Sequence, residues 1–316
     1  MNFASRLWIV AVILGLLTLS PAHAGMTHEE VKAFEGYKLL AEKGDPVAQA
    51  SLGYCYDNGE GVTEDQVQAV SWYHKAAEQG NAWAQNNLGV CYEKGDGVAK
   101  DLVQAVTWYR KAAKQGRDIA QFNLGYCYAK GNGVAKDEVQ AVSWYRQAAE
   151  QGNAAAQINL GVCYDNGAGV AKDQAQAVSW YRKAAEQGNA VAQHNLGNCY
   201  DNGEGVAKDQ MQAVTWYRKA AEQGHIAAQN NLGYCYYNGN GVAKDEIEAY
   251  AFWNLAGITN EVARKNLTIL ENKMSSDARL LGQQRTKQLQ KKIEGRLDSA
   301  RDLLKAIDKE NLRKGI

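Results

Sequence analysis

The sequence is poor in proline and carries no net charge. Only 2 of its 316 residues are proline, whereas 31 are glycine, and 35 basic residues balance 35 acidic ones. A neutral chain lacks the clustered excess of lysine and arginine that nucleic-acid binding requires, so no nucleic-acid partner is expected. The polar mean hydropathy argues against many membrane spans, and an aromatic content of 9% is too high for a disordered chain.

Long apolar runs are also scarce, and the one near the N-terminus predicts a secretory signal. Arg6 precedes an apolar run over residues 7–19, and Ala22-His23-Ala24 follows as a small-x-small cleavage site. The run is too short for a comfortable membrane span. We therefore expect a signal peptide over residues 1–24, a mature chain from about Gly25 without membrane insertion, and a periplasmic or secreted location.

A period of 36 residues organises most of the remaining chain. The motif Leu-Gly-x-Cys-Tyr occurs six times, and each copy begins 36 residues after the previous one. Such regularity is the sequence signature of a repeat architecture. The six copies begin at Leu52, Leu88, Leu124, Leu160, Leu196 and Leu232.

Each repeat is predicted to contain two helices. In the first copy, Ala48 and Leu52 begin an apolar stripe at helical spacing, and the glycines that follow residue 58 end this helix. Asp65, three residues before Gln68, predicts a capping box at the start of a second helix. Gly80 is predicted to end that helix.

Two short helices cannot bury such stripes alone, but stacked neighbours can. The expected fold class is all-α: an α-solenoid, a right-handed superhelix of six 36-residue helix-turn-helix repeats with N- and C-terminal capping helices. The expected domains are the signal peptide (1–24), an N-terminal capping helix (25–45), six repeats (46–260) and C-terminal capping helices (261–316). The last helix is basic, since residues 259–316 hold 14 basic and 8 acidic residues, and its expected role is to cover the last apolar stripe.

The first repeat carries a family resemblance. Its motif Leu52-Gly-x-Cys-Tyr-x-x-Gly-x-Gly-Val62, followed by Ala69-x-x-Trp-Tyr-x-x-Ala-Ala77 and Gly80, resembles the Sel-one-like repeat, a 36-residue relative of the tetratricopeptide repeat. The resemblance covers about residues 28–273 and implies an adaptor that holds partner proteins. Similar secreted bacterial proteins are linked with host-cell entry, immune-protein binding and control of membrane sensor kinases. A cysteine-rich branch reported to bind penicillin or act as a β-lactamase has two cysteines per repeat, whereas this chain has one.

The cysteines and tryptophans of the repeats are predicted to be structural. Equivalent positions in stacked helical repeats lie roughly 9–10 Å apart, beyond the ~7 Å limit on the Cα separation of a disulfide. Six unpaired core thiols are therefore expected, with the tryptophans filling the space between repeats. These structural residues are Cys55, Cys91, Cys127, Cys163, Cys199, Cys235, Trp72, Trp108, Trp144, Trp180 and Trp216.

The sequence predicts neither an enzyme nor a cofactor. Its five histidines share no metal-ligand spacing with each other or with cysteine, so no metal site is expected. The chain contains no Gly-x-Ser-x-Gly motif, no serine followed three residues later by lysine, and no glycine-rich phosphate loop.

The remaining candidate site is the concave groove of the solenoid. We define the groove face as the four rows of first-helix positions that vary between repeats, which in the first copy are Val47, Ala50, Tyr54 and Asp57. Aromatic anchors beside polar groups suit a protein or peptide partner. The alternative is that some of these side chains, Val90 and Val162 above all, pack between repeats. The predicted partner-binding residues are Tyr54, Asp57, Trp83, Asn86, Phe122, Tyr126, Ile158, Asp165, His194, Asp201, Tyr234 and Tyr237.

The function predicted from the sequence is that of an exported, non-enzymatic scaffold or adaptor that binds a protein or peptide partner on its concave face. Two alternatives stay open. One is a regulator of an envelope sensor kinase, in which the basic C-terminal helix docks on an acidic surface. The other is an enzyme that hydrolyses cell wall or β-lactam.

Overall fold

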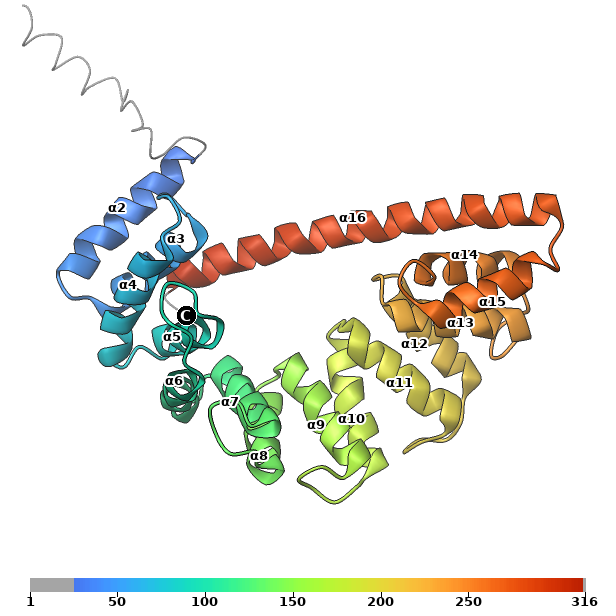
Figure 1. The fold of residues 1–316 in the computed structure, drawn as a ribbon, viewed down its shortest axis with the longest axis horizontal. Helices are drawn as coiled ribbons and strands as arrows, with labels where there is room; N and C mark the ends of the chain where they lie inside the picture. Colours follow the sequence, from blue (N-terminus) through green and yellow to red (C-terminus); the bar gives the residue numbers. More distant parts are fainter. Residues whose placement is uncertain (1–25, 315–316) are drawn as a thin grey trace, which may run out of the picture. The chain divides into compact units, whose positions relative to one another are not determined.

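The computed structural model describes residues 26–314, and every regular element within that range is a helix. The predicted signal peptide lies outside the described residues. The described chain divides into two compact units, residues 26–115 and residues 116–314. In each unit, antiparallel helix pairs stack on one another (Figure 1). The predicted all-α fold, an α-solenoid of six repeats with capping helices, is confirmed.

The first unit holds the N-terminal capping helix and repeats 1 and 2. Its helices are α2 (His28–Glu42), α3 (Pro46–Asn58), α4 (Gln66–Glu78), α5 (Ala82–Lys94) and α6 (Leu102–Lys114). The pair α3–α4 is repeat 1, and the pair α5–α6 is repeat 2. Helix α2 begins with a capping box, in which Thr27 and Glu30 each accept a hydrogen bond from the other's backbone N–H.

The second unit holds repeats 3 to 6 and the C-terminal capping helices. Repeat 3 is α7 (Asp118–Lys130) and α8 (Glu138–Glu150), and repeat 4 is α9 (Ala154–Asn166) and α10 (Gln174–Glu186). Repeat 5 is α11 (Ala190–Asn202) and α12 (Gln210–Ala221), and repeat 6 is α13 (Ile226–Asn238) and α14 (Glu246–Ala256). The caps are α15 (Glu261–Glu271) and α16 (Ser276–Lys314).

The second helix of each repeat starts after the predicted aspartate. Only one of the two hydrogen bonds of the predicted capping box is present. Asp65 accepts a hydrogen bond from the Gln68 backbone N–H at 3.0 Å. The backbone N–H of Asp65 itself donates to the Tyr56 carbonyl at 2.9 Å, so it is not available to the Gln68 side chain. The predicted capping box is therefore wrong here, because the end of the preceding helix satisfies the group that the glutamine would have bonded.

Glycines join neighbouring repeats as well as ending helices. Gly59 has a φ of 70° and caps α3, as expected for a left-handed helix end. Gly97, in the loop of repeat 2, also has positive φ, and a Cβ atom there would collide with the carbonyl of Gln66 at the start of α4. This position needs glycine for two reasons, its backbone conformation and its close approach to the preceding repeat.

The core is built in layers that span two repeats. One layer contains Tyr73 of α4, Leu88 and Cys91 of α5, and Trp108 of α6, all buried. Tyr73 lies flat against α3, where a Cβ at Gly53 would be only 2.6 Å from its ring. The helical glycine therefore forms a seat for the aromatic ring of its own repeat.

In repeats 1 and 2, a buried glutamine of the first helix satisfies the end of the preceding helix. Gln49, which is 6% exposed, donates through Nε2 to the Ala41 carbonyl at 3.2 Å, and its Oε1 accepts from Gln79 at 2.7 Å. Gln85 repeats this arrangement with Ala77 and Gln115. These bonds satisfy carbonyl groups that a helix end leaves without partners.

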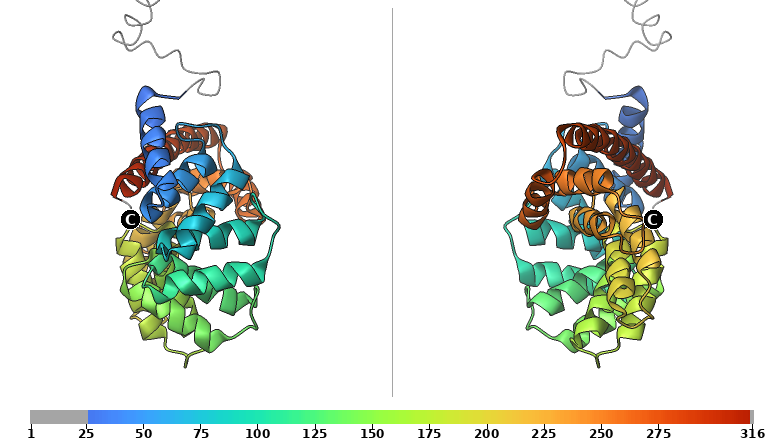
Figure 2. Two further views of the ribbon diagram at one scale, coloured as in Figure 1. Left: turned by 90° about the vertical axis from the view of Figure 1, so that its left-hand side faces the viewer. Right: turned by 90° about the vertical axis from the view of Figure 1, so that its right-hand side faces the viewer.

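The C-terminal helix α16 covers the last apolar layer of the second unit. It lies along α14 (Figure 1 and Figure 2), and Leu289 is buried in the core beside Phe252. Arg285 pairs with Glu248 at 2.6 Å, and Lys292 and Arg296 each lie 2.9 Å from a carboxylate oxygen of Glu222. The basic residues thus hold a helix that buries an apolar stripe, the role expected of a cap.

Candidate functional site

Three of the predicted aromatic anchors of the groove face pack against other aromatic rings of the chain. In the first unit, the Tyr54 and Trp83 rings lie 5.8 Å apart, and Trp83 is also 5.8 Å from the ring of Tyr73. In the second unit, the Phe122 ring lies 6.0 Å from that of Tyr145. All three predicted anchors are half-buried, so most of their apolar surface already has a partner within the chain.

Two further groove-face residues have little exposed surface. Asn86 is only 5% exposed, so little of its side chain faces solvent. Ile158 is half-buried against the core that α10 and α11 form. Helical spacing assigned both residues to one face of a helix but did not reveal how deeply each is buried.

Three side chains of the third row remain exposed. Tyr126 is 39% exposed, Val162 is 36% exposed and Tyr234 is 52% exposed. Val162 was the residue for which packing between repeats was the stronger alternative, yet it lies at the surface. Together with Val47, Ile119 and Val191 of the first row, which are 43–44% exposed, these residues form the exposed apolar part of the groove face.

In repeats 1 and 2, the acid of the groove face bonds to a tyrosine of the same repeat. Asp57 accepts a hydrogen bond from the Tyr73 hydroxyl at 3.2 Å, and Glu93 accepts one from Tyr109 at 2.5 Å. Burial raises the pKa of Asp57, an effect that the Tyr73 bond partly opposes. Asp165 and Asp201, at the same position in repeats 4 and 5, are half-buried. These carboxylates are part of the scaffold as well as of the groove edge.

Repeat 3 lacks this acid. Ala129 stands where Asp57 and Glu93 stand in repeats 1 and 2. Tyr145, 3% exposed, packs on Gly125 as its equivalents do, but among the described residues its hydroxyl has no hydrogen-bond partner. A cavity of about 340 Å³ lies here, lined in part by Tyr126, Ala129, Tyr145 and Val162.

Repeat 5 gives its tyrosine a different partner. The Tyr217 hydroxyl donates to Asn198 Oδ1 at 2.7 Å, and Asn231 donates to the same oxygen at 3.2 Å. The His194 ring lies 4.8 Å from that of His225. Burial, and secondarily the neighbouring His225, lowers the pKa of His194 to about 4, so the predicted groove residue His194 is neutral at pH 7.

The last predicted groove residue, Tyr237, contacts the C-terminal cap. Its hydroxyl accepts a hydrogen bond from Lys273 Nζ at 2.7 Å, and its ring lies 5.4 Å from Trp253. Tyr237 is half-buried. It therefore occupies the position of Asp57 but bonds to the segment that follows α15.

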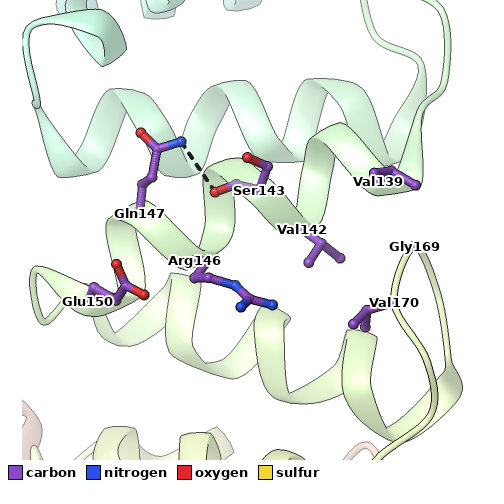
Figure 3. A pocket seen from close by; sticks show the side chains of 8 residues that line it. All are labelled: Val139, Val142, Ser143, Arg146, Gln147, Glu150, Gly169 and Val170. Atoms are coloured by element: carbon purple, nitrogen blue, oxygen red, sulfur yellow. Dashed lines mark hydrogen bonds between the residues drawn. The ribbon is translucent and has the colours of Figure 1, made fainter.

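A second depression lies on α8, away from the groove face, and was not predicted. It has a volume of about 380 Å³. Its lining residues include Val139, Val142 and Arg146 from α8 and Val170 from the loop between α9 and α10 (Figure 3). Figure 3 also shows the Gln147 amide donating to the Ser143 carbonyl at 3.4 Å. The other tryptophan-bearing repeats have lysine at the position of Gln147, which the comparison of the copies could have revealed.

The six cysteines are free thiols, and five of them are buried, with Cys163 half-buried. Burial raises the pKa of Cys55 and Cys91 to about 12, and that of Cys163 to about 11. Such thiols stay protonated at neutral pH and are poor nucleophiles. The cysteines are thus placed as core side chains.

The tryptophans lie where neighbouring repeats meet. Trp108 and Trp180 are buried, each in a layer with the second helix of the preceding repeat. Trp72, Trp144 and Trp216 are half-buried. Lys111 Nζ lies 3.7 Å from the centre of the Trp108 ring, a cation–π contact that covers its outer side.

Within residues 26–314, no three histidine, cysteine or acidic side chains come together as a metal site would require. None of the helices in this range has both the length and the apolar character needed to cross a membrane.

Comparison with known proteins gives a family and a structural relative. The Sel1 repeat is matched six times, over residues 46–81, 84–116, 118–153, 154–189, 190–225 and 226–257. A Sel1 repeat protein from Oxalobacter formigenes is 38% identical, with a TM-score of 0.64 over 73% of this chain and 97% of that one. A protective antigen of uropathogenic Escherichia coli with an SLR fold is 35% identical over 84% of this chain and 72% of that one, with a TM-score of 0.38. No curated protein matches the chain.

Proposed function

The chain belongs to the Sel1 repeat family, and on that premise we propose that it is an exported scaffold that binds a protein or peptide partner along its groove face. Sel1 repeat proteins are generally protein-interaction scaffolds. Export is proposed from the sequence of residues 1–24, and mass measurement of the protein recovered from cells would test it, since cleavage predicts a mature chain that begins at about Gly25.

The observation that carries the proposal is the exposed third row of the second unit. Tyr126, Val162 and Tyr234 occupy equivalent positions in repeats 3, 4 and 6 and are exposed, while the core positions beside them are filled by the same residues in every copy. Exposed tyrosines with polar neighbours are typical of residues that anchor a protein partner. The scaffold explains the invariant positions but not these.

Other exposed apolar residues provide a matched control. Val67 of α4 and Met211 of α12 occupy equivalent positions near the start of second helices and are 65% and 69% exposed. They lie outside the four rows of the groove face. A general stickiness of exposed apolar groups would involve them at least as much as the third row.

Site-specific photo-crosslinking tests the proposal. A benzophenone amino acid is placed at Tyr126 or Tyr234 and, as the control, at Val67 or Met211, and each protein is irradiated in its native cells. We expect one discrete adduct, identified by mass spectrometry, from the groove-face positions and not from the controls. Adducts only from the controls, or from no position, would show that the groove face is not the binding surface.

A further inference from the structure

The cavity in repeat 3 arises where the chain has lost two carboxylates. Ala129 replaces the acid that Asp57 and Glu93 supply in repeats 1 and 2. Ala168, in the turn of repeat 4, stands where Glu60 and Asp96 stand in the turns of repeats 1 and 2. Both alanines line the same cavity. The repeat pattern thus shows which chemical group is missing from it.

The polar residues that line the cavity include one carboxylate, that of Glu138, beside several donors and cations. Tyr145, whose ring is buried, lines the cavity together with Asn159, and among the described residues the Tyr145 hydroxyl has no hydrogen-bond acceptor. Lys130 and Lys136 also line it. Lys136 pairs with Glu138 at 2.7 Å, so one positive charge, that of Lys130, is left without an acidic partner in the lining.

We propose that this cavity binds a carboxylate group of a peptide partner, which takes the place that Asp57 and Glu93 occupy in repeats 1 and 2. The carboxylate accepts the hydrogen bond of Tyr145 and lies near Lys130, while Tyr126 and Val162 supply apolar walls. The inference rests on the proposed function, since it assigns one contact on the groove face to an acidic side chain or a C-terminal carboxylate.

The chemistry of the site favours a carboxylate over a neutral group. A hydroxyl donor forms a stronger hydrogen bond with a charged acceptor than with a neutral one. Burial raises the pKa of Tyr145, so the hydroxyl keeps its proton and remains a donor at neutral pH. A nearby lysine adds attraction for an anion but none for an amide.

Three short peptides distinguish the sources of the carboxylate. The first is acetyl-Ala-Ala-Glu-Ala-Ala-amide, the second is acetyl-Ala-Ala-Ala-Ala-Ala with a free C-terminus, and the third is acetyl-Ala-Ala-Gln-Ala-Ala-amide, the neutral control. Each is titrated into the purified protein while the backbone amide signals of Ala129, Tyr145 and Val162 are followed by NMR. We expect saturable shifts with the first peptide, the second or both, with a dissociation constant on the order of 1 mM for such a small contact, and none with the control.

Two variants locate the binding. Y145F removes the donor, and we expect binding to weaken about tenfold or more. A129D restores the carboxylate of repeats 1 and 2 and should abolish binding by occupying the site. Y181F, the same change one repeat later, is the matched control and should leave the affinity unchanged, because Tyr181 does not line the cavity.

Each other outcome overturns the inference. No shift with either carboxylate peptide, equal shifts with the neutral peptide, or unchanged affinity in Y145F would each show that the cavity does not recognise a carboxylate. These results leave the crosslinking test of the groove face untouched, so the failure of one idea can be told from the failure of the other. Circular dichroism and the unfolding midpoint of Y145F establish that a lost signal reflects binding rather than folding.

Discussion

Repeats 2 and 3 share one helical hairpin but finish it differently. In both, a tyrosine of the second helix lies on a glycine of the first, Tyr109 on Gly89 and Tyr145 on Gly125. In repeat 2 the hydroxyl reaches Glu93, whereas in repeat 3 the corresponding residue is Ala129 and a cavity opens. The packing of the tyrosine ring on the glycine is therefore the part of the repeat that folding requires. The acid that bonds the tyrosine hydroxyl can be replaced.

The largest effect should come from breaking the part that the two repeats share. G89A and G125A each place a methyl group within 3 Å of a tyrosine ring, at 2.6 Å and 2.8 Å. We expect each to lower the free energy of unfolding by about 3 kcal/mol, because overpacking forces the ring or the helix to move. Urea unfolding measures both losses, and a clear difference between the two would mean that the seat is not equivalent in the two repeats.

Removing the tyrosine hydroxyl should have different effects on stability in repeats 2 and 3. Y109F leaves the Glu93 carboxylate without its donor and should cost about 1–2 kcal/mol. Y145F removes a hydroxyl without an acceptor among the described residues and should change the stability by less than about 0.5 kcal/mol. The same unfolding experiment tests this pair, and the contrast fails if Y145F is as destabilising as Y109F.

In repeat 1, the charge of Asp57 should make the stability of the protein depend on pH. Burial raises the pKa of Asp57, so the folded protein holds this proton more tightly than the unfolded chain does. The stability linked to it is present below the ordinary carboxyl pKa and is lost as pH rises through the raised value. D57N keeps an acceptor for Tyr73 without that charge, so its stability relative to wild type should increase by up to about 1 kcal/mol as pH rises from the acidic range to 7.

An unchanged difference between D57N and the wild type across that range would contradict the assignment. D57A is the companion variant, because it removes both the charge and the acceptor.

Repeat 5 provides the smallest effect at neutral pH. The pKa of His194 is lowered from 6.5 to about 4, so the unfolded chain binds more protons than the folded one between these values. The contribution of neutral His194 to the free energy of unfolding is fully present above pH 6.5 and falls as the pH drops toward 4. H194N, which introduces the residue of repeats 2 and 6, should flatten this fall while changing stability at pH 7 by less than about 1 kcal/mol. Unfolding midpoints at pH 7 and pH 5 provide the measurement.

The sequence predicted the helices well. The 36-residue period fixed the number of repeats. The aspartate before each second helix and the glycines at the helix ends are local signals, so the helix starts and ends could be placed from them. The capping box was only half correct, because the Tyr56 carbonyl that displaces the Gln68 side chain belongs to a different helix.

The candidate site was harder to predict because it depends on contacts between helices. Helical spacing assigned Trp83, Asn86 and Phe122 to one face of their helices. Whether neighbouring helices cover these side chains depends on tertiary packing, which helical spacing does not reveal. The bond between Asp57 and Tyr73 joins residues 16 apart, and its existence depends on the register of the hairpin. The absence of an acid at Ala129 was visible in the sequence, but its meaning required the tyrosine opposite.

The way α16 lies on α14 also limits the length of the array. A stack of similar hairpins has no intrinsic end, since the apolar face of each last hairpin would accept another. In the second unit that face is occupied by Leu289 and Ile293, which are buried, and the helix is held by ion pairs to Glu222 and Glu248. Helix α16 therefore ends the array. It also prevents a second copy of the chain from stacking on this end, a contact that would otherwise extend into an open-ended filament.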